Sequence, residues 1–296
     1  MSPDAWIPIT IAAAFLQNVR SLLQKRLADG STVHGGAYVR FLYALPLAWI
    51  YAIAMTGTPW RYLGREAFWG WVAMAAIAQI VATACLLASF AGGRFAVGTV
   101  LSKTEAAQAA LFGLVFVGEA IGTAGLVGIA ISFVGVLVLT GRSSLEGVGP
   151  RTFALGLASG SFFGVAAVGF RAAALALPLE SAPRAAAVTL AVALTIQTVV
   201  YGAFLAWREP ATLGVVRRQW RTGLAVGASG MAASAGWFTA MALVNAALVR
   251  ALGQVELVFT LAVSAFWLRE RIGARELLGV ALVVTGLVFV TLSPVR

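Results

Sequence analysis

Long runs of apolar residues, separated by short polar stretches, follow one another along the whole chain. Each run reaches about 20 residues, enough to cross about 30 Å of hydrocarbon as a helix. The pattern predicts ten transmembrane helices, at residues 5–27, 36–55, 67–91, 95–117, 121–140, 152–177, 184–206, 220–243, 246–268 and 272–292. The predicted fold class is therefore an all-α polytopic membrane protein.

Composition agrees with this pattern and narrows the function. Of the 296 residues, 60% are hydrophobic and 11% charged, whereas a soluble domain is roughly 45–50% apolar and 25% charged. No Gly-x-x-x-x-Gly-Lys-Ser/Thr phosphate loop is present, and ten spans leave little chain for a nucleotide-hydrolysing domain. Asp4 and Asp29 are the only aspartates and His34 is the only histidine. We therefore predict no enzyme activity, no metal site and no cofactor.

The net charge of +10 would favour nucleic-acid binding in a soluble protein. Here Lys and Arg gather between the apolar runs, as the positive-inside rule expects, so no nucleic-acid partner is predicted. Four of the 21 basic residues fall on the face that carries the termini and thirteen on the other face. This bias predicts that both termini lie outside the cytoplasm.

The chain divides at one polar linker and repeats itself on either side. Residues 141–150 form a stretch bearing Gly, Ser and Pro, so we predict two units, residues 1–145 and 146–296. Adding 151 to positions in the first unit gives the same residue type in the pairs Arg20/Arg171, Glu105/Glu256, Glu119/Glu270, Ile121/Ile272, Gly122/Gly273, Leu126/Leu277, Gly128/Gly279, Gly135/Gly286 and Thr140/Thr291.

This constant offset indicates an internal duplication of five-helix units. Because five is odd, the two units enter the membrane from opposite sides, which makes the repeats inverted. Inverted repeats are typical of alternating-access transporters, whose binding site lies between the halves near the midplane.

The fourth and ninth predicted spans and their successors contain the most specific motif. The two copies read Glu105-Ala-Ala-Gln…Gly118-Glu119-Ala-Ile-Gly122 and Glu256-Leu-Val-Phe…Arg269-Glu270-Arg-Ile-Gly273. In both, a second glutamate follows the first by fourteen residues. This spacing resembles the end of an EamA domain of the drug/metabolite transporter superfamily, in its ten-helix branch.

The resemblance implies a carrier with a central cavity in the bacterial inner membrane. It implies efflux of a small organic metabolite, such as an amino acid or a drug-like compound, and a passive channel is the alternative. The proline that often follows the intramembrane glutamate in that family is replaced by Ala106 and Leu257, so the sequence does not itself predict a helix break there. The termini of that family are usually cytoplasmic, opposite to the charge bias of this chain.

Ionisable residues inside a span are costly and are therefore candidates for function. Glu105 and Glu256 fall near the middle of their spans, where they could contact substrate or bind a coupling proton. The alternative is a packing role, because a duplicated packing feature also repeats. Lys103 lies two residues from Glu105, which predicts that it faces another side of the same helix. Lys103 could recognise a substrate carboxylate, or it could extend its ammonium group toward the lipid headgroups, and the sequence does not decide between these roles.

Amides inside the apolar runs complete the candidate set, because an amide in lipid seeks a polar partner. The predicted substrate-binding residues are Gln17, Asn18, Gln79, Lys103, Glu105, Gln254 and Glu256. The expected partners are a small molecule and the lipid bilayer, while a coupling proton and a homodimer stay open. Arg20, Arg171 and Arg250 are expected to snorkel, and Trp237 is expected to face lipid.

Overall fold

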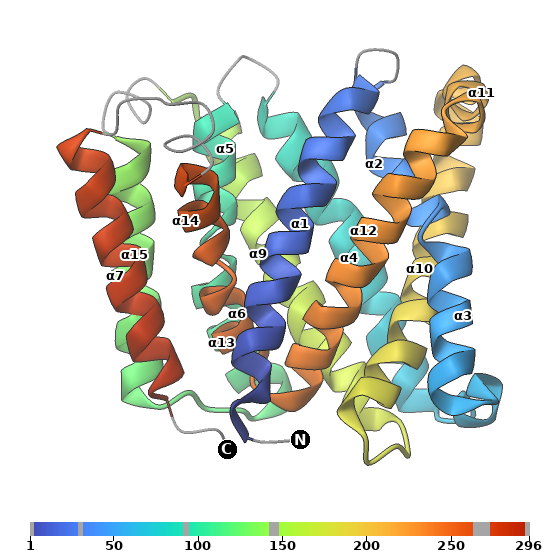
Figure 1. Ribbon diagram of the computed structural model, residues 1–296, viewed down its shortest axis with the longest axis horizontal. Coiled ribbons are helices and arrows are strands. Elements are labelled where there is room, and N and C mark those ends of the chain that lie inside the picture. Colours follow the sequence, from blue (N-terminus) through green and yellow to red (C-terminus); the bar gives the residue numbers. More distant parts are fainter. Residues whose placement is uncertain (1–2, 29–31, 91–94, 142–147, 263–272, 294–296) are drawn as a thin grey trace.

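A computed structural model of the chain describes residues 3–28, 32–90, 95–141, 148–262 and 273–293. The secondary structure in these ranges consists of helices joined by turns and short connections, without strands. The long helices lie side by side, and both chain termini lie at the same edge of the molecule (Figure 1). We call this edge the terminal side.

The helices of the first half are α1 (Trp6–Ala28), α2 (Val33–Leu42), α3 (Leu45–Thr56), α4 (Glu66–Phe90), α5 (Phe95–Ser102), α6 (Glu105–Phe112) and α7 (Thr123–Thr140), with short turns η1 (Pro3–Ala5), η2 (Pro59–Tyr62) and η3 (Gly113–Val117). Those of the second half are α9 (Pro150–Ala176), α10 (Ala182–Arg208), α11 (Pro210–Arg218), α12 (Trp220–Leu243), α13 (Ala246–Leu252), α14 (Val255–Ala262) and α15 (Ala274–Thr291).

Eight helical segments of the described ranges are long and apolar enough to cross a membrane. They coincide with eight of the ten predicted spans, so the prediction of a polytopic all-α membrane protein is confirmed. The predicted eighth span corresponds to α12, which has the length but not the apolar character of the others. The ninth is interrupted between α13 and α14, and its end at 263–268 lies outside the described residues, as do most of the predicted linker and Glu270.

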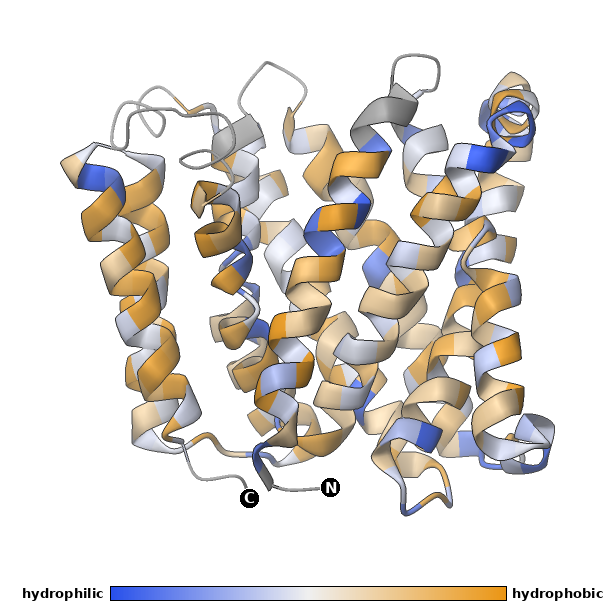
Figure 2. Ribbon diagram, in the orientation of Figure 1, coloured by the Kyte–Doolittle hydropathy of each residue, from blue (hydrophilic) through white to orange (hydrophobic). Residues whose placement is uncertain are grey.

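Apolar side chains cover the outer surfaces of the long helices, where lipid would surround them. Figure 2 shows hydrophobic residues along these helices and hydrophilic residues mainly at their ends, with a few at mid-helix. Large exposed apolar side chains include Ile50, Leu111, Val199 and Val288. On a soluble protein so much exposed apolar surface would cause aggregation, whereas in a bilayer it is solvated by lipid tails.

Helices of the two halves pack against each other in pairs. α4 packs on α9, α1 packs on α12, and α7 packs on α15. Small residues bring α7 and α15 together: a Cβ on Gly128 would lie 2.6 Å from the carbonyl oxygen of Gly286, and one on Gly135 would lie 2.7 Å from that of Gly279. These four glycines therefore allow the two helices to approach closely.

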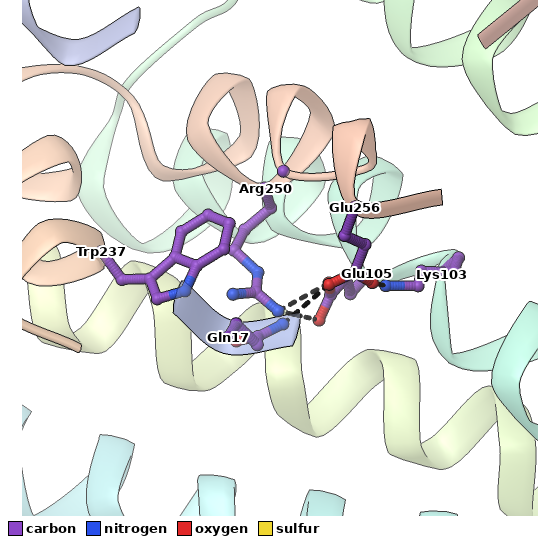
Figure 3. A pocket seen from close by; sticks show the side chains of 7 residues that line it. Gln17, Lys103, Glu105, Trp237, Arg250 and Glu256 are labelled. Carbon is purple, nitrogen blue, oxygen red and sulfur yellow. Dashed lines mark hydrogen bonds and ion pairs between the residues drawn. The ribbon is translucent and has the colours of Figure 1, made fainter. Parts of the chain in front are cut away.

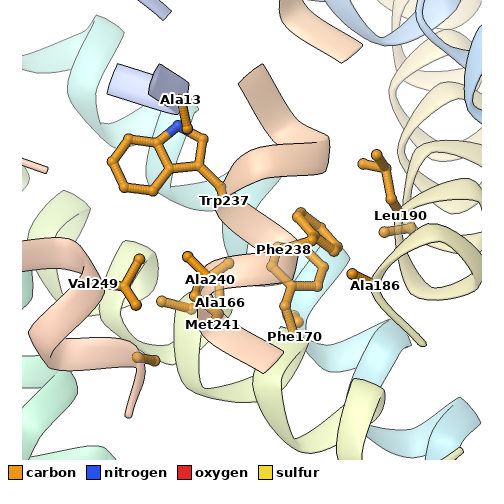
Figure 4. Close-up of a cluster of buried hydrophobic side chains, with 14 of the residues drawn as sticks. Ala13, Ala166, Phe170, Ala186, Leu190, Trp237, Phe238, Ala240, Met241 and Val249 are labelled. Carbon is orange, nitrogen blue, oxygen red and sulfur yellow. The ribbon is translucent and has the colours of Figure 1, made fainter. Parts of the chain in front are cut away.

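Packing is tightest toward the terminal side. There Phe170 of α9 and Phe238 of α12 meet with ring centroids 4.4 Å apart, inside a cluster of buried side chains that includes Leu190 of α10 (Figure 4). Every residue of α13 except Arg250 is buried, whereas none of α14 is. The helix that continues from α13 into α14 thus passes from a closed region into a loosely packed one.

Candidate functional site

Two helices of the molecule are interrupted near their middles, at matching positions of the two halves. Lys103 and Thr104 separate α5 from α6, and Gly253 and Gln254 separate α13 from α14. The offset of 151 takes Ser102 to Gly253 and Lys103 to Gln254, so the two interruptions are separated by the same offset as the matching residue pairs. Interrupted helices at membrane depth are tolerated where they line a cavity, because their backbone polar groups then find partners.

Each interruption places a glutamate at the start of the following helix. Glu105 begins α6, and its side chain is 7% exposed. Both of its carboxylate oxygens accept from Nη2 of Arg250, at 2.6 and 2.7 Å. Arg250 lies on α13, so this buried ion pair joins the two halves of the chain. Such pairs are stable only when both partners are present, since removing one leaves an uncompensated buried charge.

Glu256 makes the second connection between the halves. Its carboxylate pairs with Nζ of Lys103 and accepts from Nε2 of Gln17 at 2.8 Å. Nδ2 of Asn18 donates to the backbone carbonyl of Glu256 at 3.2 Å. α1 and the α5–α6 interruption therefore hold the start of α14 through these polar contacts, and Phe15 of α1 also meets Phe259 of α14 edge to face.

A narrow cavity lies between these side chains (Figure 3). Its lining comes from α1, α12 and the two interrupted helices, namely Gln17, Lys103, Glu105, Trp237, Arg250, Gly253 and Glu256. The Arg250 guanidinium lies 5.1 Å from the centre of the Trp237 ring, a cation–π contact. A Cβ on Gly253 would lie 2.4 Å from the Trp237 ring, so only glycine leaves room for the indole here.

Positive charge exceeds negative charge around the cavity. The side chain of Arg20, on α1, lies against Gly230 of α12. Its guanidinium is attracted by the Glu256 carboxylate and repelled by Arg250. Arg40 of α2 lies within reach of Arg20 and donates to Thr83. Within the described ranges no carboxylate forms an ion pair with Arg20 or Arg40.

A separate buried ion pair lies toward the terminal side. Nε of Arg171, on α9, donates to both carboxylate oxygens of Glu119 at 2.9 and 2.8 Å. Nη1 of Arg171 donates to the carbonyls of Met241 and Val244, each at 2.7 Å, at the end of α12. One guanidinium thus fixes α9, the end of α12 and the segment before α7 to one another.

The structure brings together most of the predicted site residues. Gln17, Lys103, Glu105 and Glu256 line the cavity, and Asn18 contacts the backbone of Glu256. Two predicted residues lie elsewhere. Gln79 accepts from Nε2 of Gln197 at 2.6 Å, between α4 and α10. Gln254 is 2% exposed and does not line the cavity.

Several predictions about charged and aromatic residues were wrong. Lys103 and Glu105 line the same cavity, because the interruption at residues 103–104 replaces the continuous helix that the prediction assumed. Arg171 and Arg250 do not snorkel, since each forms an ion pair inside the protein. Trp237 is 6% exposed and does not face lipid.

These features define a multi-pass membrane protein with a charged cavity enclosed between its two halves. The model of the EamA-like transporter family matches residues 151–292, so the second half of the chain belongs to that family and the predicted resemblance is confirmed. This match supports an EamA-type membrane transporter of small molecules.

The fold as a whole is also similar to a known one. A solved protein crystal structure superposes with a TM-score of 0.75 over 97% of this chain and 96% of that chain, at 18% sequence identity. At this identity the likeness concerns the fold alone. Among curated proteins no sequence matches the chain.

Proposed function

We propose that this chain is a secondary transporter that exports a small organic metabolite, an amino acid or a drug-like compound, by alternating access. The observation that carries the proposal is the pair of ion-paired glutamates at the matching helix interruptions. Glu105 of the first half binds Arg250 of the second, and Glu256 of the second half binds Lys103 of the first. Contacts of this kind hold the halves together, yet each can be exchanged for a contact with substrate.

The proposed architecture is ten transmembrane helices in two inverted five-helix repeats, residues 1–145 and 146–296. The helix pairing supports it. Under the offset of 151, α1 corresponds to α9 and α4 to α12, so the α4–α9 and α1–α12 pairs are equivalent to each other. α7 corresponds to α15 under the same offset, and these two helices pack against each other.

In the proposed mechanism the conformation described here is closed at the terminal side. Arg171 and Glu119 join three segments there, and α13 is buried. α14, beyond the cavity, has no buried residue in its described length. Substrate would enter from the loosely packed side, separate the ion pairs that cross the cavity, and be released after the terminal side opens.

We place the protein in the bacterial inner membrane on the family resemblance, and its termini outside the cytoplasm on the charge bias of its connections. In this orientation the loosely packed side faces the cytoplasm, as an exporter awaiting substrate requires. Glu105 and Glu256 are the proposed sites for a coupling proton, since a carboxylate that loses its cation inside a membrane is readily protonated.

The test is transport by the purified protein in proteoliposomes. We expect Glu105→Gln and Glu256→Gln each to lower coupled transport, or to remove its dependence on pH, because the amide keeps the shape but not the charge. Glu180→Gln is the matched control, since Glu180 is exposed in the α9–α10 connection. Unchanged kinetics in both cavity variants would assign the glutamates to packing and contradict the proposal.

A further inference from the structure

We infer that the substrate of this cavity is a small organic anion that binds through a carboxylate. The inference rests on the proposed transport function and adds the charge of the transported molecule. It is based on the charge balance of the cavity, on hydrogen-bond donors that lack acceptors, and on the apolar wall that the cavity presents.

Among the described residues, Arg20 lies near the cavity lining without an ion-pair partner of its own. Lys103 and Arg250 are neutralised by Glu256 and Glu105 respectively. Arg20 is attracted by Glu256, which Lys103 already neutralises, and it is repelled by Arg250 and Arg40. A surplus cation inside a membrane protein is costly unless an anion joins it, and a bound carboxylate supplies that anion.

Unused hydrogen-bond donors point to the same chemistry. The Nε atoms of Arg20 and Arg250 and the indole Nε1 of Trp237 are buried, and among the described residues they find no acceptor. Nε of Arg40 is in the same state. Arg250 uses Nη2 alone for both oxygens of Glu105, so the rest of its guanidinium remains available. Oε1 of Gln254, next to Gly253 of the cavity lining, is a buried acceptor without a donor, against the three unused donors of Arg20, Arg250 and Trp237.

A carboxylate satisfies this arrangement better than a neutral or cationic ligand. It has two oxygens that accept from a guanidinium fork, and its charge reduces the repulsion between Arg20 and Arg250. A cation would add to the surplus charge, and a neutral amide would bring donors where acceptors are lacking. Trp237 gives the cavity apolar surface, which an organic body can cover and an inorganic anion cannot.

Ligand binding to purified wild-type protein in detergent at low ionic strength tests the inference. The probes are succinate, benzoate and indole-3-acetate, the amide of each acid, 1,4-diaminobutane and inorganic phosphate. We expect at least one carboxylate to raise the unfolding temperature in a saturable manner, and its amide and the diamine to leave it unchanged.

Variants of Arg20 link the binding to the cavity. Arg20→Gln removes the surplus charge and should weaken binding of that carboxylate by about tenfold or more, because a charge-assisted hydrogen bond is lost. Arg20→Lys keeps the charge and should restore part of the affinity. Arg61→Gln is the matched control, since Arg61 is exposed in η2 on the terminal side, and it should bind as wild type does. If Arg20→Gln does not fold, the comparison of Arg20→Lys with Arg61→Gln gives the same test.

Failure of the inference and failure of the proposed function give different results. Binding of a carboxylate without transport in proteoliposomes supports the anion site and contradicts the transport proposal. Transport of neutral or cationic compounds, with no carboxylate bound, contradicts the anion site and leaves the transport proposal standing. Binding of phosphate but of no carboxylate, or equal binding of an acid and its amide, also overturns the inference.

Discussion

Two sets of ion pairs inside this protein differ in what they leave unsatisfied. The terminal-side pair, Arg171 with Glu119, balances its charge, and Arg171 also donates to two backbone carbonyls. The central cluster, Lys103 and Glu256 with Glu105 and Arg250, has the uncompensated Arg20 beside it and buried donors without acceptors.

This difference separates a structural contact from a binding site. Removing a partner from a complete buried pair only costs stability, because no ligand is needed to complete it. An incomplete cluster in a cavity is completed by a ligand instead. We therefore expect the terminal-side pair to affect folding and closure, and the central cluster to affect transport.

The largest expected effect is on stability, from Glu119→Gln. This change leaves Arg171 buried without its counter-charge, which costs about 3–5 kcal/mol when one partner of a buried pair is removed. Thermal unfolding of the purified protein in detergent measures the loss. Glu180→Gln, an exposed glutamate on the same side, should unfold as wild type does. Equal stability of the two variants would show that the terminal-side pair is not needed for closure.

The second-largest expected effect is a loss of transport in the Arg250→Gln variant. Glu105 then loses its cation, and the cavity loses a positive charge and the contact with Trp237. We expect transport to fall by about tenfold, the equivalent of about 1.4 kcal/mol. Stability should fall less than in Glu119→Gln, because a second cation, Lys103, lines the same cavity as Glu105. A stability loss as large as that of Glu119→Gln, with transport per folded molecule unchanged, would reverse the roles of the two regions.

A smaller effect is expected from Gly253→Ala. The added methyl would overlap the Trp237 ring, which must then move within the cavity. We expect KM to rise a few fold, with a stability cost of about 1–3 kcal/mol from overpacking. Gly214→Ala, where a Cβ meets nothing within 4 Å, is the matched control for kinetics and unfolding. A normal KM in Gly253→Ala would show that the position of Trp237 does not matter to substrate.

The smallest effect on transport is expected from Gln79→Leu. Gln79 contacts Gln197 and lies outside the cavity lining, so transport should stay within about twofold of wild type, and the orphaned Gln197 amide should cost about 1–2 kcal/mol. Gln17→Leu, on the cavity side, provides the comparison in the same assay. A larger transport loss for Gln79→Leu than for Gln17→Leu would extend the substrate site toward α4 and α10.

Much of this arrangement could be predicted from the sequence. Apolar runs located the helices, and the constant offset singled out Glu105 and Glu256 because ionisable residues are rare inside spans. The interruptions were missed, because residues 103–104 lack the proline that usually signals a break. On a continuous helix the side chains of Lys103 and Glu105 point in different directions, so the sequence did not predict that both line one cavity.

The long-range partners of the buried arginines and of Trp237 could not be predicted from the sequence either. Arg171 and Glu119 are far apart in the sequence, and the packing of α9 against α6 and η3 brings them together. Distance from a span end predicts snorkelling when no partner is known, so the burial of Arg171 and Arg250 required the tertiary structure. The same holds for Trp237, whose position depends on Gly253 of a different helix.

Counterflow in proteoliposomes tests the central claim most directly, with a carboxylate that binds the purified protein as the transported compound. An alternating-access carrier should take up labelled compound faster when unlabelled compound is present on the opposite side, and its rate should saturate with concentration. Uptake that rises linearly with concentration and does not respond to compound on the opposite side would contradict the account and favour a passive channel.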